Sequence, residues 1–292
     1  MTKSIPVTIS LLLIVILLIG CQRLPLAVSK PAPAFDGERA YRDVAHQLSL
    51  GPRTPGSPGH QAVRQWLTAE LEQAGWQVEV QQGTRLGHPI YNIIAFRGSG
   101  LEQGYYLLGA HYDTRFRADQ DPLPDKTVQP VPGANDGASG VAVLLELARV
   151  LPEGLDPHVR LVFFDAEDNG NLPGWDWILG SRIYAGNMEV RPGAVVILDM
   201  IGDRDLNIYQ ERTSTPWLRE EIWQAAADLG YQTEFINEVK YSILDDHTPF
   251  LERGIPAVDV IDFDYPYWHT TEDTLNKVSA RSLDIVGETI LS

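Results

Sequence analysis

The sequence predicts an α/β domain in which a mostly parallel sheet is covered by helices on both faces. Apolar, strand-like runs alternate with segments of helical periodicity from about residue 40 to the carboxyl end. Such alternation is typical of parallel sheets whose crossover connections are helices. Two of the runs, residues 160–166 and 194–202, are almost entirely apolar, as expected of strands buried on both faces. In folds of this class the functional side chains collect at the carboxyl ends of the strands.

The elements follow in a regular order. A helical pattern runs from Ala40 to Gly75 and is interrupted by turn-forming residues at 51–59, because Gly and Pro break a helix. Three strand-like runs come next, at residues 76–80, 91–96 and 105–111. They are followed by a polar, proline-containing stretch at residues 115–132, which predicts a long surface loop. The remaining chain predicts three further strands, at residues 160–166, 194–202 and 255–262. It also predicts three helices, at residues 139–151, at 216–229 and from about 280.

The amino-terminal residues predict export. In residues 1–20, Lys3 precedes an apolar run that is short for a membrane span, the pattern of a secretory signal. Residues 18–21 (LIGC) resemble the lipobox of bacterial lipoproteins, which makes Cys21 the lipidated residue; an uncleaved anchor helix is the alternative. Residues 21–35 are then expected to hold the lipidated cysteine and a Pro- and Ala-rich tether, and residues 36–292 to form the mature domain. We expect an exported protein, lipid-anchored to the periplasmic or extracellular face of the bacterial cell envelope.

Composition excludes several classes of function. Cys21 is the only cysteine, so the domain has no disulfide, thiolate metal site or cysteine nucleophile. A formal net charge of −16 argues against a nucleic-acid partner, because phosphate binding needs a basic face. The chain also lacks the G-x-S-x-G elbow of serine hydrolases.

Polar residues follow the predicted strands at the points where these strands end. The positions concerned are His111 and Asp113, Asp165 to Asp168, Asp199 and His269, with Asp136 in the glycine-rich turn at residues 133–137. Imidazole and carboxylate ligands without thiolate favour zinc, with manganese or cobalt as weaker candidates. Carboxylates gathered without a cation would repel one another.

Each of these residues also has an ordinary structural interpretation. Asp136 suits a helix N-cap, Asp199 the start of a loop, His269 a loop position, and Glu167 with Asp168 a solvated turn. Their joint occurrence at successive strand ends favours the metal site.

Six motifs follow one another along the predicted domain: residues 111–114 (HYDT), 133–140 (GANDGASG), 163–168 (FFDAED), 198–202 (LDMIG), 245–250 (DDHTPF) and 268–274 (WHTTEDT). In this order they resemble the M28 metallopeptidase superfamily over nearly the whole mature domain. The resemblance implies a three-layer α/β/α sandwich with a central mixed, mostly parallel sheet, as in zinc aminopeptidases. It also implies zinc at the strand ends and peptide or protein amino termini as substrates, and we expect a monomer.

The resemblance assigns roles to matching positions. The ligands of a first zinc are Asp136, Asp168 and His269. Those that would complete a second zinc site, bridged by Asp136, are His111 and Asp199. Glu167 takes the place of the general acid/base, and Asp113 that of a residue orienting His111. His247 and Asp259 are expected, like Asp113, to support the site without binding the ion.

Two branches of the superfamily are compatible with these motifs. Glutaminyl-peptide cyclotransferases use one zinc to convert amino-terminal glutamine into pyroglutamate, and di-zinc aminopeptidases hydrolyse amino-terminal residues. The cyclase is favoured by Trp268 directly before His269 and by the pair Asp245-Asp246 before His247. Residues 55–65, YNIIAF and GSR (180–182) also resemble the cyclase pattern. Two departures are Asp168 in the place of a glutamate and Asp259 in the place where animal cyclases carry a histidine.

In the cyclase interpretation, Asp199 and Asp245 hold the substrate amine or the tetrahedral intermediate. Trp268 and one of Trp175 or Trp177 wall a small pocket that excludes water. In the aminopeptidase interpretation two zincs share Asp136 and Glu167 is the base. A non-catalytic lipoprotein binding module is the third hypothesis, and it is disfavoured because every ligand position carries a metal-competent residue.

Overall fold

The computed structural model describes residue 1 and residues 34–98, 104–152 and 159–292. The predicted signal, Cys21 and most of the tether lie outside the described residues, so the lipid anchor stays a prediction. In the described part of the chain, no helix has the length and apolar character needed to span a membrane.

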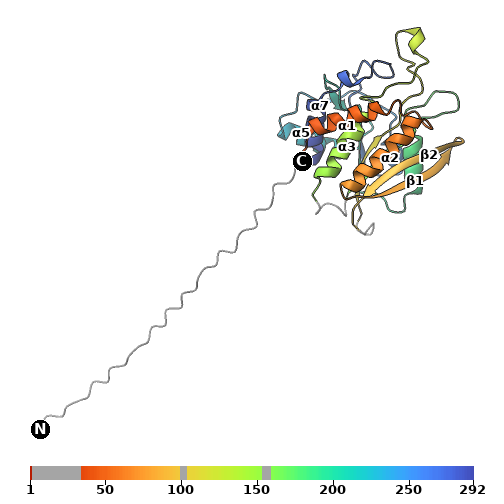
Figure 1. The fold of residues 1–292 in the computed structure, drawn as a ribbon. Coiled ribbons are helices and arrows are strands. Elements are labelled where there is room, and N and C mark those ends of the chain that lie inside the picture. Colours follow the sequence, from red (N-terminus) through yellow and green to blue (C-terminus); the bar gives the residue numbers. More distant parts are fainter. Residues whose placement is uncertain (2–33, 99–103, 153–158) are drawn as a thin grey trace. The chain divides into compact units, whose positions relative to one another are not determined.

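A mixed sheet of six strands forms the centre of the domain, in the order β1-β2-β4-β3-β5-β8. Four of the strands run parallel: β3 (Tyr106–His111), β4 (Val159–Phe164), β5 (Ala194–Asp199) and β8 (Ala257–Ile261). The other two, β1 (Gln77–Arg85) and β2 (His88–Phe96), form an antiparallel hairpin at one edge (Figure 1). The predicted mixed, mostly parallel sheet is confirmed.

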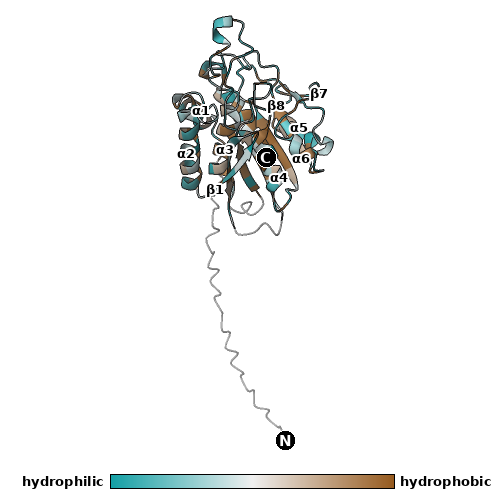
Figure 2. Ribbon diagram, turned by 90° about the vertical axis from the view of Figure 1, so that its right-hand side faces the viewer, coloured by the Kyte–Doolittle hydropathy of each residue, from teal (hydrophilic) through white to brown (hydrophobic). Residues whose placement is uncertain are grey.

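Helices cover both faces of this sheet. A larger hydrophobic cluster holds α1 (Gly37–Ser49), α2 (Pro58–Gln73), α3 (Ala138–Val150) and α7 (Ala280–Leu291) against one face. A smaller cluster holds α4 (Leu179–Asn187) and α6 (Thr248–Leu251) against the other. Helix α5 (Pro216–Asp228) contacts α7 and β8. In Figure 2 the apolar strands, in brown, lie between helices on either side, which is the predicted three-layer arrangement.

Helix α3 is buried along nearly its whole length, because the sheet lies on one side of it and α1 and α7 on the other. Its one acidic residue, Glu146, is fully buried and accepts hydrogen bonds from Arg39 at 2.5 Å and from Arg149 at 3.3 Å. A buried carboxylate needs such partners. These bonds tie α1 to the central helix that begins at the glycine-rich turn.

Several elements differ from the sequence predictions. The hairpin strands β1 and β2 extend past the predicted runs to a turn at Leu86 and Gly87, where φ is positive. The short pair β6 (Ile208–Gln210) and β7 (Phe235–Val239) and the helices α4 and α6 were not predicted. Residues 115–132 are a loop with one short 3-10 helix, but their prediction as a surface segment is partly wrong. Four of their side chains are buried, at positions 115, 118, 121 and 131.

Candidate active site

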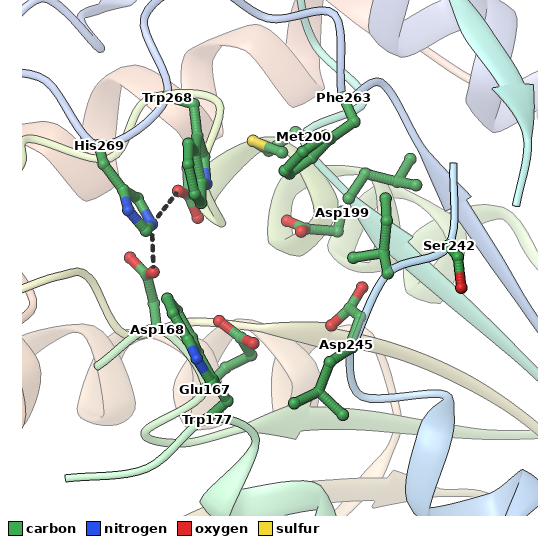
Figure 3. Close-up of a pocket in the computed structure, with 14 residues that line it drawn as sticks. Glu167, Asp168, Trp177, Asp199, Met200, Ser242, Asp245, Phe263, Trp268 and His269 are labelled. Carbon is green, nitrogen blue, oxygen red and sulfur yellow. Dashed lines mark hydrogen bonds and ion pairs between the residues drawn. The ribbon is translucent and has the colours of Figure 1, made fainter. Parts of the chain in front are cut away.

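The carboxyl ends of the parallel strands and the segment after β8 surround a pocket of about 250 Å³. Its walls combine acidic side chains with aromatic and aliphatic ones (Figure 3). The acidic and imidazole residues of the lining are Asp136, Glu167, Asp168, Asp199, Asp245 and His269. The parallel strands end at one edge of the sheet, which is why residues so distant in sequence meet there.

The structure brings the five predicted metal ligands together in two groups that share Asp136, and in each group one ligand atom per residue lies within 4.8 Å of the others. In the first, His269 Nε2 lies 2.7 Å from Asp168 Oδ1 and 3.7 Å from Asp136 Oδ2. In the second, His111 Nε2 lies 3.1 Å from Asp136 Oδ1 and 3.2 Å from Asp199 Oδ1. Asp136 therefore offers one oxygen to each group, as a bridging ligand does.

The donor set fits a divalent cation. Asp136 Oδ2 and Asp168 Oδ2 are buried without a hydrogen-bond partner, which is costly for a charged group. Burial and the negative charge of Asp136 raise the pKa of Asp168 to about 6. Burial also raises the pKa of Asp199 to about 7, although His111 opposes the shift. A bound cation would offset this cost, because a nearby positive charge favours the ionised carboxylates.

Asp113, two residues after β3, connects the ligands to the catalytic candidate. Its carboxylate accepts the backbone N–H groups of Glu167 at 2.9 Å and Asp168 at 3.4 Å. It also lies 3.5 Å from Nδ1 of His111. One side chain thus holds the turn after β4 and faces the imidazole, the arrangement that orients a metal-bound histidine.

The glycine-rich turn depends on two residues that the sequence reasoning missed. Asp273 accepts the backbone N–H groups of Asn135 at 2.9 Å and Asp136 at 3.2 Å. The fully buried Arg53 donates to the carbonyl oxygens of Pro132 and Gly133, at 3.0 and 2.6 Å. Asp273 lies inside the motif at residues 268–274, so membership of that motif could have indicated a role for Asp273 at the site. Arg53 lies in the stretch 51–59, where proline and glycine suggested only a turn.

Arg115 and Asp119 are a second missed pair, placed by sequence in a surface loop. Arg115 donates to Asp119 at 2.8 and 2.6 Å and to the carbonyl oxygen of Asp168 at 2.9 Å. Asp119 Oδ1 lies 3.6 Å from Nδ1 of His269. Nothing in the local sequence pattern signals this contact, because it depends on how the loop folds back over the strand ends.

Aromatic side chains wall the pocket. Trp177 and Trp268 both line it, and each stacks on His269, with ring centroids 5.9 and 3.7 Å apart. Of the two alternatives Trp175 and Trp177, only Trp177 lines the pocket; Trp175 stacks on His88 at 3.7 Å instead. The apolar residues that complete the lining and that sequence reasoning missed are Met200, Ile243, Leu244, Ile261 and Phe263.

Glu167 and Asp245 both direct their carboxyl groups into the pocket in Figure 3. Burial raises the pKa of Glu167 well above its ordinary value; His111 opposes this and Asp245 reinforces it. Glu167 can therefore accept and hold a proton near neutral pH. His247 and Asp259, predicted as supporting residues, are fully buried behind Asp245 and do not reach the pocket.

Comparisons with known proteins agree with this geometry. The model of peptidase family M28 matches residues 92–292. The glutaminyl-peptide cyclotransferase of Boiga irregularis is 31% identical over 86% of this chain and 78% of its own length. The crystal structure of Porphyromonas gingivalis glutaminyl cyclase has a TM-score of 0.83 and 36% identity, covering 89% of this chain and 98% of that one. A zinc-dependent exopeptidase from Parabacteroides distasonis has a TM-score of 0.82 and 33% identity, covering the same shares, 89% and 98%.

Proposed function

The chain belongs to peptidase family M28, and on that premise we propose that it is a zinc-dependent glutaminyl-peptide cyclotransferase. It would convert the amino-terminal glutamine of peptides or proteins into pyroglutamate and release ammonia. One observation carries the proposal: Glu167, the first metal-ligand group and two tryptophans, Trp177 and Trp268, all line the same pocket. The similarity to cyclotransferases from animals and bacteria supports the same conclusion.

Asp136, Asp168 and His269 would hold the zinc ion, which would supply a Lewis acid for the γ-amide oxygen of the substrate. These residues are buried and their free carboxylate oxygens lack other partners. Asp136 Oδ2 and Asp168 Oδ2 can therefore take up a cation without losing a hydrogen bond, whereas the 2.7 Å contact between His269 Nε2 and Asp168 Oδ1 would be replaced by contacts to the ion.

Glu167 would move the proton of the reaction. The substrate's α-amino nitrogen forms a bond to the carbonyl carbon of the γ-amide, and the bond from that carbon to the amide nitrogen breaks. Glu167 accepts a proton from the attacking amine and returns it to the departing nitrogen, which leaves as ammonia. The raised pKa of Glu167 suits both transfers. The neutral amine is available, because its reference pKa is about 7.7–8.0.

The other lining residues would position the substrate and exclude water. Asp199 and Asp245 face the pocket and can accept hydrogen bonds from the amino group. Trp177, Trp268 and Phe263 form an apolar wall around the reacting amide. Exclusion of water matters here, because hydrolysis of the γ-amide would yield glutamate in place of pyroglutamate.

An M28 aminopeptidase is the second candidate function. The group of His111, Asp136 and Asp199 is intact and supports a second zinc. The similarity to a zinc-dependent exopeptidase, with a TM-score of 0.82 and 33% identity, is nearly as strong as that to the glutaminyl cyclase, with 0.83 and 36%. In that case Glu167 would act as the base toward a water molecule. A non-catalytic binding module has no comparable support, because the ligands and Glu167 are all in place.

The deciding experiment offers the full-length, zinc-loaded chain two peptides that differ only in an amino-terminal glutamine or leucine. Mass spectrometry follows the products. Loss of ammonia from the first peptide with the second intact supports the cyclase. Release of free leucine would make the chain an aminopeptidase. No change in either peptide would contradict both the cyclase and the aminopeptidase proposals.

We further propose that the chain works as a monomer tethered to the cell envelope through a lipid on Cys21. Residues 1–35, with a signal-like run, a lipobox-like tetrad and a Pro- and Ala-rich segment, support this location. The acidic net charge of −16 supports peptide rather than nucleic-acid partners.

A further inference from the structure

A third group of potential ligands lies outside the two groups described above. It consists of Asp245, His247 and Asp259, whose ligand atoms lie within 4.8 Å of one another. We propose that this group binds a divalent cation that accepts imidazole and carboxylate ligands, such as zinc. The proposal is independent of whether the pocket holds one catalytic ion or two.

Unpartnered polar atoms are concentrated at this place. Asp245 Oδ2, His247 Nδ1 and both carboxylate oxygens of Asp259 are buried without a hydrogen-bond partner. Both carboxylate oxygens of the adjacent Asp246 share this condition. Carboxylates that are removed from water without compensation are strongly destabilising. A cation among them would satisfy several of these atoms at once.

The environment of His247 fixes which of its nitrogens faces the group. Thr213 donates its only hydroxyl proton to Glu211 Oε2 at 2.9 Å. The same hydroxyl lies 2.9 Å from His247 Nε2, so it can only accept a proton from that nitrogen. In neutral His247 the proton is then on Nε2, and Nδ1 presents a lone pair toward Asp259.

A lone pair directed at carboxylates calls for a positive charge between them. The distance from His247 Nδ1 to Asp259 Oδ2 is 3.8 Å, too long for a hydrogen bond. It resembles the 3.7 Å between His269 Nε2 and Asp136 Oδ2 in the first ligand group. Two atoms that bind one zinc ion tetrahedrally at about 2.0–2.2 Å lie about 3.3–3.6 Å apart, so small movements of the side chains would bring either pair to that separation.

Glu211 supports His247 as a carboxylate supports a metal-bound histidine. Its Oε2 lies 3.5 Å from His247 Nε2 and accepts from the backbone N–H and the hydroxyl of Ser214, at 2.7 and 2.9 Å. These donors keep Glu211 as an acceptor that faces the Nε2–H side of the ring. A carboxylate on the far nitrogen fixes the tautomer of a histidine ligand and raises its basicity.

Asp262 gives the contrast. This aspartate is also fully buried, directly after β8. Its two oxygens accept the backbone N–H groups of Asn207 at 2.8 Å and Asp264 at 3.0 Å. Asp262 thus needs no cation, whereas Asp259, three residues earlier, lacks any such donor on either oxygen.

A shared proton between Asp245 and Asp259 is the rival explanation. It would remove one negative charge, but it would leave the lone pair of His247 Nδ1 without a partner. A cation satisfies this lone pair and both carboxylates. Because Asp245 also lines the catalytic pocket, a cation bound to it would keep its carboxylate ionised and fixed beside the substrate amine.

Anomalous diffraction tests the proposal directly. Crystals of the full-length chain grown with zinc are measured on both sides of the zinc absorption edge. We expect a peak among Asp245, His247 and Asp259, separate from any peak at Asp136. Peaks confined to the ligands around Asp136 would overturn the third site, and the catalytic proposal would be untouched.

Zinc content of variants gives a second test in solution. Asp259→Asn and His247→Gln are each expected to lose about one zinc per chain by elemental analysis, after equilibration with excess zinc and removal of free metal. The matched control Asp262→Asn should keep the wild-type content. If either site variant folds, as judged by circular dichroism, and retains the full wild-type content, the proposal is wrong. The diffraction measurement needs no variant and decides the matter if neither folds.

Discussion

Trp177 stacks nearly parallel on the imidazole of His269, with the ring centroids 5.9 Å apart and an angle of 13° between the planes. The contact joins a wall of the pocket to a ligand of the metal group. Trp175, two residues earlier, stacks on His88 instead. The two tryptophans are both half-buried and offer a matched pair for testing which side chain shapes the pocket.

Replacement of Trp177 by leucine should lower kcat/KM for a glutamine-initiated peptide by about tenfold, the effect of losing an aromatic contact of about 1.5 kcal/mol. Trp175→Leu should leave kcat/KM close to that of the wild type, because Trp175 does not line the pocket. Steady-state kinetics of the two variants provide the measurement. Equal losses in both would contradict the assignment of the wall.

Glu167→Gln should reduce kcat by about 10² to 10⁴, the usual contribution of a general acid/base. The backbone of Glu167 is held by Asp113, so the substitution should leave the fold and the zinc content unchanged. Glu252→Gln, at an exposed carboxylate paired with Arg182, is the control for loss of a glutamate. Retention of more than a tenth of wild-type kcat by Glu167→Gln would argue that another group carries the proton.

Asp119→Asn should weaken zinc binding by about 10- to 100-fold, because it removes the carboxylate facing Nδ1 of His269. The distance between these two atoms is 3.6 Å, and Arg115 fixes Asp119 in place. Competition with a chromophoric chelator measures the dissociation constant without reference to activity. Asp125→Asn, in the exposed 3-10 helix of the same loop, should bind zinc as the wild type does.

Glu211 should make the stability of the fold depend on acidity. Burial would raise its pKa, but hydrogen bonds from His247 and from backbone N–H groups hold it at about 2. Since this value lies below that of the unfolded chain, ionised Glu211 stabilises the fold above about pH 4.5, and this stabilisation is lost as the pH falls toward 2. A shift of this size corresponds to about 3 kcal/mol.

The expected result is that Glu211→Gln lowers the free energy of unfolding at pH 6 and that the difference from the wild type shrinks toward pH 3. Urea unfolding at a series of pH values measures it. Glu220→Gln, on the exposed side of α5, controls for the change in net charge. A difference that stays constant with pH would show that Glu211 does not titrate in this way.

Cys21→Ser should abolish incorporation of labelled fatty acid when the full-length chain is expressed in a bacterial host. The sequence assigns the only cysteine of the chain to the lipobox-like tetrad, so no other thiol can replace it. Cell fractionation should then move the protein out of the membrane fraction. Label that persists in the variant would favour the uncleaved anchor helix over the lipoprotein.

The sequence by itself determined the class of fold and the residues that meet at the strand ends. Buried parallel strands must be apolar on both faces, so residues 160–164 and 194–198 could be recognised as strands from composition alone. Where each such strand stops, the first polar residues lie at one edge of the sheet. His111, Asp168 and Asp199 could therefore be grouped without any knowledge of distances.

Only the tertiary structure decided which side chains support that group. Asp119 and Arg53 reach the site from loops, and the path of a loop depends on long-range contacts that leave no periodic pattern in the sequence. The choice between Trp175 and Trp177 turns on the direction of each side chain along an irregular segment. The tautomer of His247 likewise depends on Thr213 and Glu211, which are distant in sequence. Local patterns specify elements, whereas the orientation of buried polar groups is set by partners that only the folded chain brings within hydrogen-bonding distance.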